Sequence, residues 1–433
     1  MSGPSLTPAE PGVNHVFNVA AVAVGLLAVG GGSVLAVAVA SRSLDATAFA
    51  TFAIWMTLAN LLGLVFSVVE LYLPRLLIGL PGAGAQAPLV RTTTRAVSCS
   101  VAVLWVLLLV TSWWTVDRLL AGSPQLLALA ALYALALAFQ SLQRGVAVGR
   151  GRFAVFTVQM GADGAMRAAA SVLLAVSGHA SPEAFALVQC AAAGAGVVAG
   201  TVLERNWSGW RGPCGSVAGG PVLLLLVAVT GPLVVNNAGV PWLAAAGAPS
   251  LAVGAVAGAL TLSRVPTLLV GAAYGPVLAP LARAAEQGDW AAYRRVHRRA
   301  LAGAVVFAVV FAAAYAAVGS ALLELYLGPG YVLPARDLVA FAGGSGLMFV
   351  SVVEQAALGA LSAWSWTAAA WAAGLTCFVG LLLLGGGPPV RLLSFAVLLA
   401  PAVAVLVMGA GVRRAERRGL SSGAIVGSTG EGW

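Results

Sequence analysis

The sequence predicts an all-α integral membrane protein of about twelve transmembrane helices, arranged as two parallel six-helix lobes around a central cleft, with both termini in the cytoplasm. Three observations carry this prediction. Of the 433 residues, 60% are hydrophobic and only 9% are charged, whereas a soluble domain carries about a quarter charged residues. Arginines gather in alternate loops, and one pattern of proline and arginine occurs twice.

Twelve apolar segments, each bounded by charges, proline or glycine, are long enough to cross a bilayer. They cover residues 16–40, 47–73, 96–116, 125–148, 153–176, 183–203, 221–246, 250–273, 300–323, 335–358, 363–384 and 391–412. The first segment is longer than the apolar core of a signal peptide and no arginine precedes it. We therefore expect it to be a true transmembrane helix.

The arginines orient the chain. All 23 basic residues are arginine; 17 of them, Arg144 included, fall on the side of the N-terminus, four fall on the other side, and Arg167 and Arg264 lie within predicted helices. Because positive charge is retained in the cytoplasm, this asymmetry places both termini inside. It also accounts for the net charge of +9, so no nucleic-acid partner is expected. The lack of lysine is typical of a GC-rich bacterial genome, which predicts a multi-pass protein of the bacterial inner (plasma) membrane.

An internal duplication divides the chain. Pro74 and Arg95 flank the loop between the second and third spans, and Pro280 and Arg299 recur between the eighth and ninth, 206 and 204 residues later. An even number of spans per repeat gives both lobes the same orientation. We expect an N-terminal lobe over 1–203, a cytoplasmic linker over 204–220, a C-terminal lobe over 221–412 and a basic, then flexible, cytoplasmic tail over 413–433.

The first helix of each lobe carries helix-weakening residues. These are Gly30, Gly31 and Gly32 in one, and Pro232 and Pro241 around an asparagine pair in the other. Proline removes a backbone donor and weakens the helix at mid-membrane, so these residues are candidate hinges beside a binding region. Close helix packing through small residues is the alternative explanation of the glycines.

Ionisable groups inside a membrane are expensive and must face protein or water. Asp163 and Arg167 lie four residues apart on one helix face, either as a self-neutralised pair or as part of a cleft. Arg264 requires carbonyl groups, a phosphate, or a carboxylate such as that of Glu70 or Glu354. We take Arg264, Arg167, Asn236 and Asn237 as candidate substrate-binding residues, and Asp163, Glu70 and Glu354 as a coupling site or structural ion pairs.

Residues 283–299, with Trp290 and Tyr293 among their charges, are expected to form a short amphipathic helix at the cytoplasmic interface. No catalytic motif, metal-ligand spacing or cofactor motif occurs in the chain, so neither an enzyme, a metal site nor a cofactor is predicted.

Five segments resemble the polysaccharide-export and O-antigen-flippase branch of the multidrug, oligosaccharidyl-lipid and polysaccharide (MOP) flippase superfamily. They are Asp45–Ala53, Arg144–Phe153, Gly231-Pro232 with Asn236-Asn237, Tyr274–Leu301 and Leu325–Tyr331. The resemblance implies a flippase that moves a lipid-linked oligosaccharide of the polyprenyl-diphosphate type from the inner to the outer leaflet by alternating access. Its partners would be this lipid-linked sugar, membrane lipid and other polysaccharide-assembly proteins.

Two alternatives stay open. A cation-coupled drug or metabolite antiporter of the same superfamily would need an acidic site deep in one lobe, for which Asp163 is the candidate. A membrane-embedded polysaccharide polymerase or ligase would need a large outer loop, and the expected outer loops are only of ordinary connection length.

Overall fold

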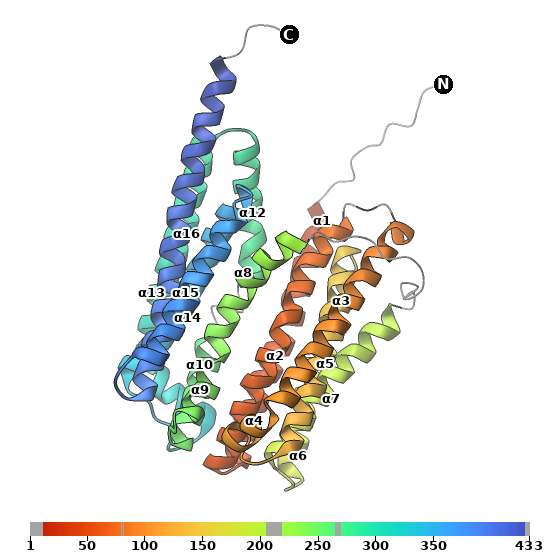
Figure 1. Ribbon diagram of the computed structural model, residues 1–433, viewed down its shortest axis with the longest axis vertical. Helices are drawn as coiled ribbons and strands as arrows, with labels where there is room; N and C mark the ends of the chain where they lie inside the picture. The colour runs from red at the N-terminus through yellow and green to blue at the C-terminus, as the bar shows by residue number, and fades with distance from the viewer. Residues whose placement is uncertain (1–11, 79, 81, 205–218, 265–269, 429–433) are drawn as a thin grey trace.

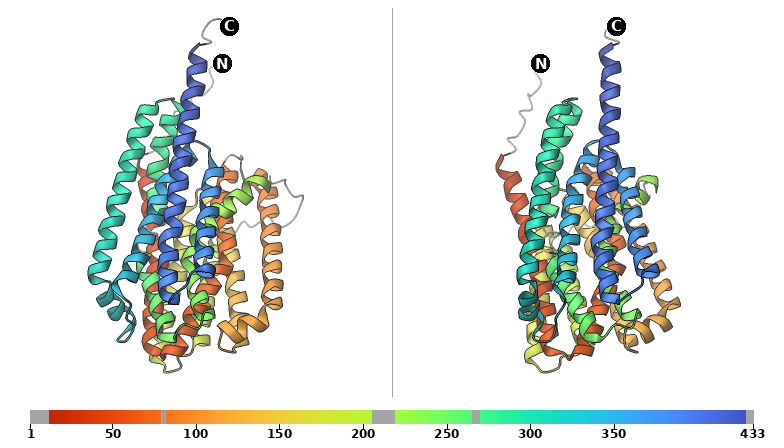
Figure 2. Two further views of the ribbon diagram at one scale, coloured as in Figure 1. Left: turned by 60° about the vertical axis from the view of Figure 1, so that its left-hand side comes forward. Right: turned by 90° about the vertical axis from the view of Figure 1, so that its left-hand side faces the viewer.

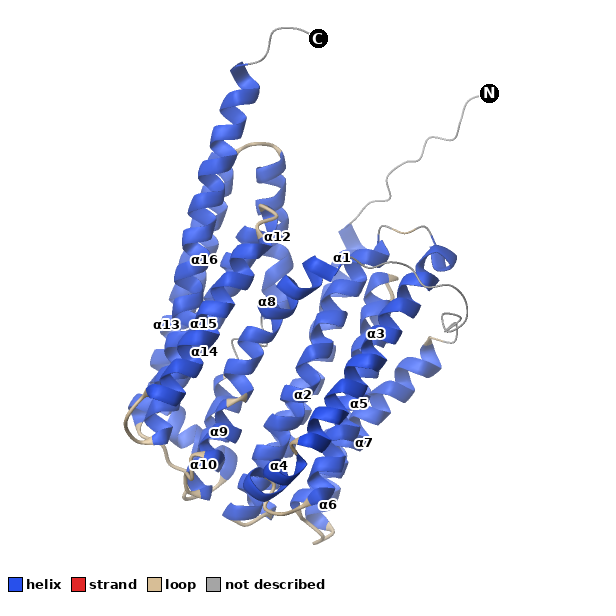
Figure 3. Ribbon diagram, viewed as in Figure 1, coloured by secondary structure: helices blue, strands red, loops and turns tan. Residues whose placement is uncertain are grey.

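The computed structural model describes residues 12–78, 80, 82–204, 219–264 and 270–428, and this part of the chain consists of helices and their connections (Figures 1 and 3). The all-α prediction is therefore confirmed. The helices of the first half are α1 (Gly12–Ser43), α2 (Ala46–Ile78), α3 (Gly82–Val110), α4 (Ser112–Leu119), α5 (Pro124–Gly149), α6 (Phe153–Val176) and α7 (Pro182–Leu203). Those of the second half are α8 (Gly219–Asn237), α9 (Gly239–Ala245), α10 (Ser250–Ser263), α12 (Val270–Glu286), α13 (Trp290–Leu327), α14 (Ala335–Ala360), α15 (Trp364–Leu384) and α16 (Pro389–Ser428).

Within the described ranges, nine helices are long and apolar enough to cross a membrane, and α8 with α9 forms a bent pair that would be a tenth span. Helix α6 carries Asp163 and Arg167, which lower its hydropathy. Helices α10 and α12 flank residues 265–269, which lie outside the described residues. Together these elements agree with about twelve predicted spans, and the protein is a multi-pass membrane protein.

Local chemistry explains where several helices begin. Ser123 and Ser181 precede Pro124 and Pro182, and each serine hydroxyl accepts a hydrogen bond from a backbone N–H of the first turn of α5 or α7. Proline suits the first helical position because its missing N–H would have no intrahelical partner there. Asp289 caps α13 by accepting a hydrogen bond from the Ala292 N–H at 2.8 Å.

Helices of each half pack mainly among themselves. In the first half α1 packs on α6 and α2 on α5, and in the second half α13 packs on α14 and α15 on α16. Helix α2 joins the halves by contacting α8, α9 and α10. Figure 1 shows the two groups of helices beside each other, and Figures 1 and 2 show α1 beginning and α16 ending at the same end of the molecule.

The structure corrects two predicted elements. Residues 283–299 do not form a separate interfacial helix, because α12 continues to Glu286 and α13 begins at Trp290, so the segment is the tip of a helical hairpin. The eighth predicted span is not one helix up to residue 273, since α10 ends at Ser263. The predicted linker over 204–220 lies outside the described residues except Glu204 and the start of α8, and the lobe boundaries stay a prediction.

The glycines of α1 serve close packing at one position. A Cβ atom on Gly32 would lie 2.4 Å from the carbonyl oxygen of Gly164 in α6, and one on Gly164 would lie 2.3 Å from the carbonyl oxygen of Ala28. The two backbones therefore touch where only glycine fits. Gly31 faces open space, and α1 runs from Gly12 to Ser43 across Gly30.

Candidate functional site

A polar cavity of about 230 Å³ lies where the two halves meet. Helices α1, α2, α5 and α6 supply most of its lining, and Thr261 of α10 and Arg264 after it supply the rest. Three arginines and one aspartate are among its lining residues: Arg144, Arg167, Arg264 and Asp163. Arginines therefore outnumber carboxylates among the residues that line this cavity.

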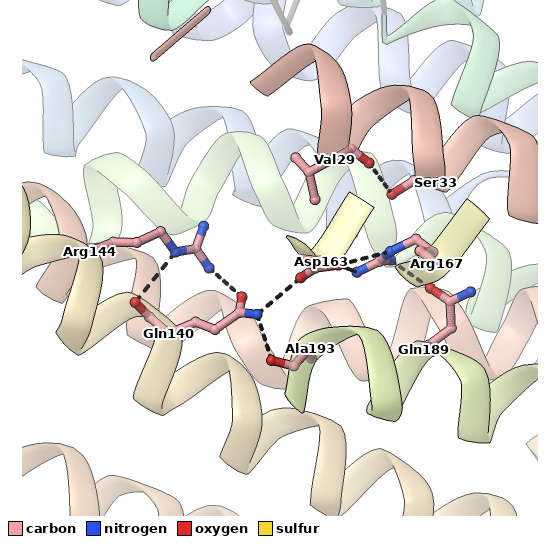
Figure 4. Close-up of polar contacts among 8 residues, drawn as sticks. All are labelled: Val29, Ser33, Gln140, Arg144, Asp163, Arg167, Gln189 and Ala193. Atoms are coloured by element: carbon pink, nitrogen blue, oxygen red, sulfur yellow. Dashed lines mark hydrogen bonds and ion pairs between the residues drawn. The ribbon is translucent and has the colours of Figure 1, made fainter. Parts of the chain in front are cut away.

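Asp163 and Arg167 form a buried ion pair on α6, with 3% and 6% of their surfaces exposed. Arg167 donates from Nη2 to Asp163 Oδ1 at 2.7 Å and from Nη1 to Gln189 Oε1 at 2.6 Å (Figure 4). Gln140 donates from Nε2 to Asp163 Oδ2 at 3.0 Å. Both carboxylate oxygens thus have donors, as a charge buried inside a membrane requires.

The polar chain continues along α5 toward the end where α1 begins. Arg144 donates from Nη2 to Gln140 Oε1 at 2.7 Å (Figure 4), and its Nη1 lies 3.5 Å from Glu70 Oε2. Arg144 is one of the 17 arginines whose distribution orients the chain. Its position within α5 and on the cavity shows that it is also part of the candidate site.

Arg264 lies at the ends of two broken helices. It caps α10, and its Nη2 donates to the backbone oxygen of Asn236 and, at 3.2 Å, to Asn237 Oδ1. Helix α8 ends at Asn237 and meets α9 at a bend of 48°. The last carbonyl groups of a helix have no intrahelical partner and carry partial negative charge, so the ends of α8 and α10 suit a guanidinium.

The bend in the seventh predicted span therefore lies between Pro232 of α8 and Pro241 of α9, at the asparagine pair. Asn236 also donates from Nδ2 to Met348 Sδ at 3.2 Å, and Asn237 donates from Nδ2 to the Leu233 carbonyl oxygen at 2.8 Å. Both asparagines are buried beside Arg264 rather than among the lining residues of the cavity.

Of the two remaining candidate acids, Glu70 is next to a residue that lines the cavity and Glu354 lies away from it. Glu70 is beside Arg144, and Glu354 of α14 is buried with its Oε2 3.3 Å from Nε2 of His297 in α13. Glu354 is therefore separate from the cavity and from the Asp163 pair.

Two of the resemblance segments meet at the opposite end of the molecule. The ring of Phe49 in α2 packs edge-on against that of Tyr331, with centroids 5.5 Å apart. Arg42, at the end of α1, donates to the backbone oxygen of Leu325 in α13. These contacts join the two halves at that end.

Sequence reasoning missed the neutral polar residues of the site. Three buried glutamines make hydrogen bonds here. Gln140 donates to Asp163, and Gln189 accepts from Arg167. Gln159 donates from Nε2 to Gln143 Oε1 at 2.9 Å. Glutamine inside an apolar helix is a signal that could have found them, because its amide also needs partners in a membrane.

Comparison with known proteins shows the fold. No protein-family model matches the chain, and no curated protein matches it in sequence. A mutant of the Vibrio cholerae MATE transporter VcmN is similar with a TM-score of 0.62 and 14% identity, over 94% of this chain and 97% of that chain. The eukaryotic MATE transporter AtDTX14 is similar with a TM-score of 0.60 and 12% identity, over 93% of this chain and 98% of that one.

A MOP superfamily transporter from Pyrococcus furiosus is similar with a TM-score of 0.58 and 12% identity, over 94% of this chain and 96% of that one. The binding pocket of that transporter is described as having reverse polarity, which suggests a different function for it. The chain therefore has the fold of MATE transporters of the MOP superfamily.

Proposed function

We propose that the protein is a membrane transporter that moves a lipid-linked oligosaccharide, bearing a polyprenyl diphosphate, from the inner to the outer leaflet by alternating access of its two halves. The observation that carries the proposal is the surplus positive charge of the cavity: three arginines line it, and Asp163 and Glu70 pair with two of them, which leaves one positive charge in excess. Guanidinium groups bind phosphate oxygens in bidentate geometry, and they do so strongly where water is excluded.

The arginines come from both halves. Arg167 is on α6, whereas Arg264 follows α10. An anion between them would contact both halves at once, so its entry and release would be linked to their relative movement. Alternating access requires that the substrate bind the inward-open and outward-open arrangements of the halves with different free energies.

Neutral polar groups fit the sugar part of such a ligand. Gln159 lines the cavity, and within the described residues its Oε1 is buried without a hydrogen-bond partner. Buried polar atoms are almost always satisfied by protein, water or ligand, and a sugar hydroxyl is a suitable donor. The cavity of about 230 Å³ is smaller than a typical ligand pocket of roughly 300–1,000 Å³, so a whole head group would enter only as the halves separate.

A cation-coupled drug antiporter is the second candidate, because a multidrug resistance MATE family transporter of the MOP superfamily has the same fold, with a TM-score of 0.57. Such a function would place a cation at Asp163, but both oxygens of that carboxylate already accept hydrogen bonds from Arg167 and Gln140. An excess of arginine also disfavours a cationic drug.

Deletion of the gene, followed by analysis of lipid-linked sugars in each leaflet, tests the proposal. Accumulation on the inner leaflet is the expected result. Accumulation on the outer leaflet would instead indicate a polymerase or ligase, and unchanged lipid-linked sugars would contradict the proposal. A plasmid copy carrying Arg264→Gln should fail to restore outer-leaflet delivery of the lipid-linked sugar, whereas Arg118→Gln, an exposed residue of α4 outside the cavity, should restore it.

A further inference from the structure

A second cavity, of about 440 Å³, shares no lining residue with the first. The segments that line it belong to the end of the molecule where α1 begins and α16 ends (Figure 1). The start of α13, the turn between α14 and α15, and the last third of α16 surround it. Its polar and aromatic lining residues are Trp290, Ser362, Ser365, Trp366, Arg414 and Arg418.

The charge of this cavity is positive. Arg414 and Arg418 are four residues apart, so they lie on one face of α16, one turn from each other. Among the described residues that line the cavity there is no carboxylate. Glu416 is two residues from each arginine, and side chains with that spacing on a helix do not face each other. The cavity therefore suits an anion with several oxygen atoms.

The first turn of α15 adds hydrogen-bond donors. The residue that precedes it, Ala363, has no side-chain oxygen and makes no side-chain cap, unlike Asp289 at the start of α13. The Trp366 N–H already donates to the Ala363 carbonyl oxygen at 3.1 Å, and the Ser365 N–H is at the helix N-terminus, a position that favours an anion. The hydroxyl groups of Ser362 and Ser365 line the same cavity.

Two tryptophans place the cavity at the edge of the bilayer. Trp366 packs against α16 at Gly411, where a Cβ atom would lie 2.7 Å from the ring, and Trp290 faces the cavity from α13. Tryptophan concentrates at the level of lipid headgroups. The apolar stretch of α16 leads directly into Arg413, Arg414, Arg417 and Arg418, which marks the end of the hydrocarbon region.

We propose that this cavity binds the phosphate-bearing headgroup of an anionic phospholipid of the leaflet on this side, with Arg414 and Arg418 contacting the phosphate. A headgroup at this depth meets the arginines, the start of α15 and the tryptophans together, while its acyl chains stay in the bilayer beside α16. Basic cavities between transmembrane helices at the cytoplasmic end are suited to such headgroups. Bound lipid would fix the position of α16 relative to α13 and α15.

A second pair of arginines on α16 provides a matched control. Arg413 and Arg417 are also four residues apart on α16 and exposed, but they are not among the lining residues. The double variants R414Q/R418Q and R413Q/R417Q remove the same charge from the same turns of one helix. Only the first pair would change the cavity.

The test uses the full chain in nanodiscs of phosphatidylcholine, either alone or with one-fifth phosphatidylglycerol, with native mass spectrometry of retained lipid and thermal melting as readouts. Wild type and R413Q/R417Q should retain phosphatidylglycerol and melt higher in its presence. In nanodiscs with phosphatidylglycerol, R414Q/R418Q should melt at the temperature that wild type shows without this lipid. Its affinity for phosphatidylglycerol should be about thirtyfold weaker, because each lost arginine contributes about 1 kcal/mol.

Equal loss in both double variants would show attraction to the general surface charge and overturn the proposal, as would retention of the lipid by R414Q/R418Q. A further measurement adds inorganic phosphate to the protein in phosphatidylcholine nanodiscs, and it distinguishes a lipid headgroup from free phosphate as the ligand. A rise in melting temperature of the same size with inorganic phosphate alone would assign the site to a soluble anion instead of a lipid.

Discussion

Gly32→Ala tests whether the glycines of α1 serve packing or bending. A Cβ atom at Gly32 would lie 2.4 Å from the Gly164 carbonyl oxygen, whereas ordinary contact begins near 3.4 Å. Helices α1 and α6 would have to separate by about 1 Å, and overpacking of this kind costs about 1–3 kcal/mol. We therefore expect Gly32→Ala to lower the free energy of unfolding by that amount.

Gly31→Ala is the matched control. A Cβ atom there meets nothing within 4 Å, and alanine favours a helix over glycine by up to about 1 kcal/mol. The assay is unfolding of the purified protein in mixed micelles by titration with dodecyl sulfate, followed by tryptophan fluorescence. Equal stability of the two variants would refute the packing argument, and loss of transport in both without loss of stability would support the hinge instead.

Further predictions concern charge and closure. Asp163→Asn should destabilise the protein by about 3–5 kcal/mol, since it leaves the Arg167 charge buried, and Asp163→Leu with Arg167→Met should recover most of this in the same unfolding assay. Glu204→Gln should cost about 1–3 kcal/mol by the same measurement, because the buried Glu204 carboxylate lies 3.0 Å from one arginine and 3.7 Å from a second; no change would show that neither contact stabilises the fold. Phe49→Ala should open the end of the molecule where Phe49 packs on Tyr331. In a background without native cysteines, it should therefore speed the labelling of Ser33→Cys, in the cavity lining, by a membrane-impermeant thiol reagent added on that side. An unchanged labelling rate would contradict a closing role of this contact.

Much of the helical architecture could be predicted from sequence because membrane thickness fixes the length of each apolar run. The predicted span over 125–148 corresponds to α5 (Pro124–Gly149), and that over 183–203 to α7 (Pro182–Leu203). Proline after a capping serine marks both starts. The bend between α8 and α9 falls between Pro232 and Pro241, the two prolines that the sequence marks as candidate hinges.

Hydropathy could not locate the end of α10 or the tip of the α12–α13 hairpin. Residues 250–273 carry a single charge, Arg264, and enough apolar residues for one span, so mean hydropathy does not distinguish one helix from a helix that ends at Ser263. Pro266 is the local signal for an end, because proline disfavours helical backbone at the residue before it. The arginines of residues 283–299 indicated an interface, whereas the structure extends α12 and α13 beyond the apolar stretch as one hairpin.

The site was predicted in part because charged groups in apolar helices are conspicuous. Asp163 and Arg167 could be paired from their spacing of four residues. Their partners Gln140 and Gln189 come from other helices, 23 and 22 residues away in sequence, and such contacts depend on tertiary packing. Arg144 was assigned to the flank of its helix because a count of loop charges does not say which way a side chain points.

The proposed transport depends on the binding of an anion in the cavity between the halves. The most direct test measures binding of a short-chain polyprenyl diphosphate sugar, and of a cationic dye, to the purified protein and to Arg264→Gln. Removing one guanidinium from a buried phosphate contact costs about 2 kcal/mol or more, so we predict about thirtyfold weaker binding of the diphosphate by the variant and little binding of the dye by either protein. Tight binding of the dye by wild type, with equal diphosphate affinity in both proteins, would contradict the claim.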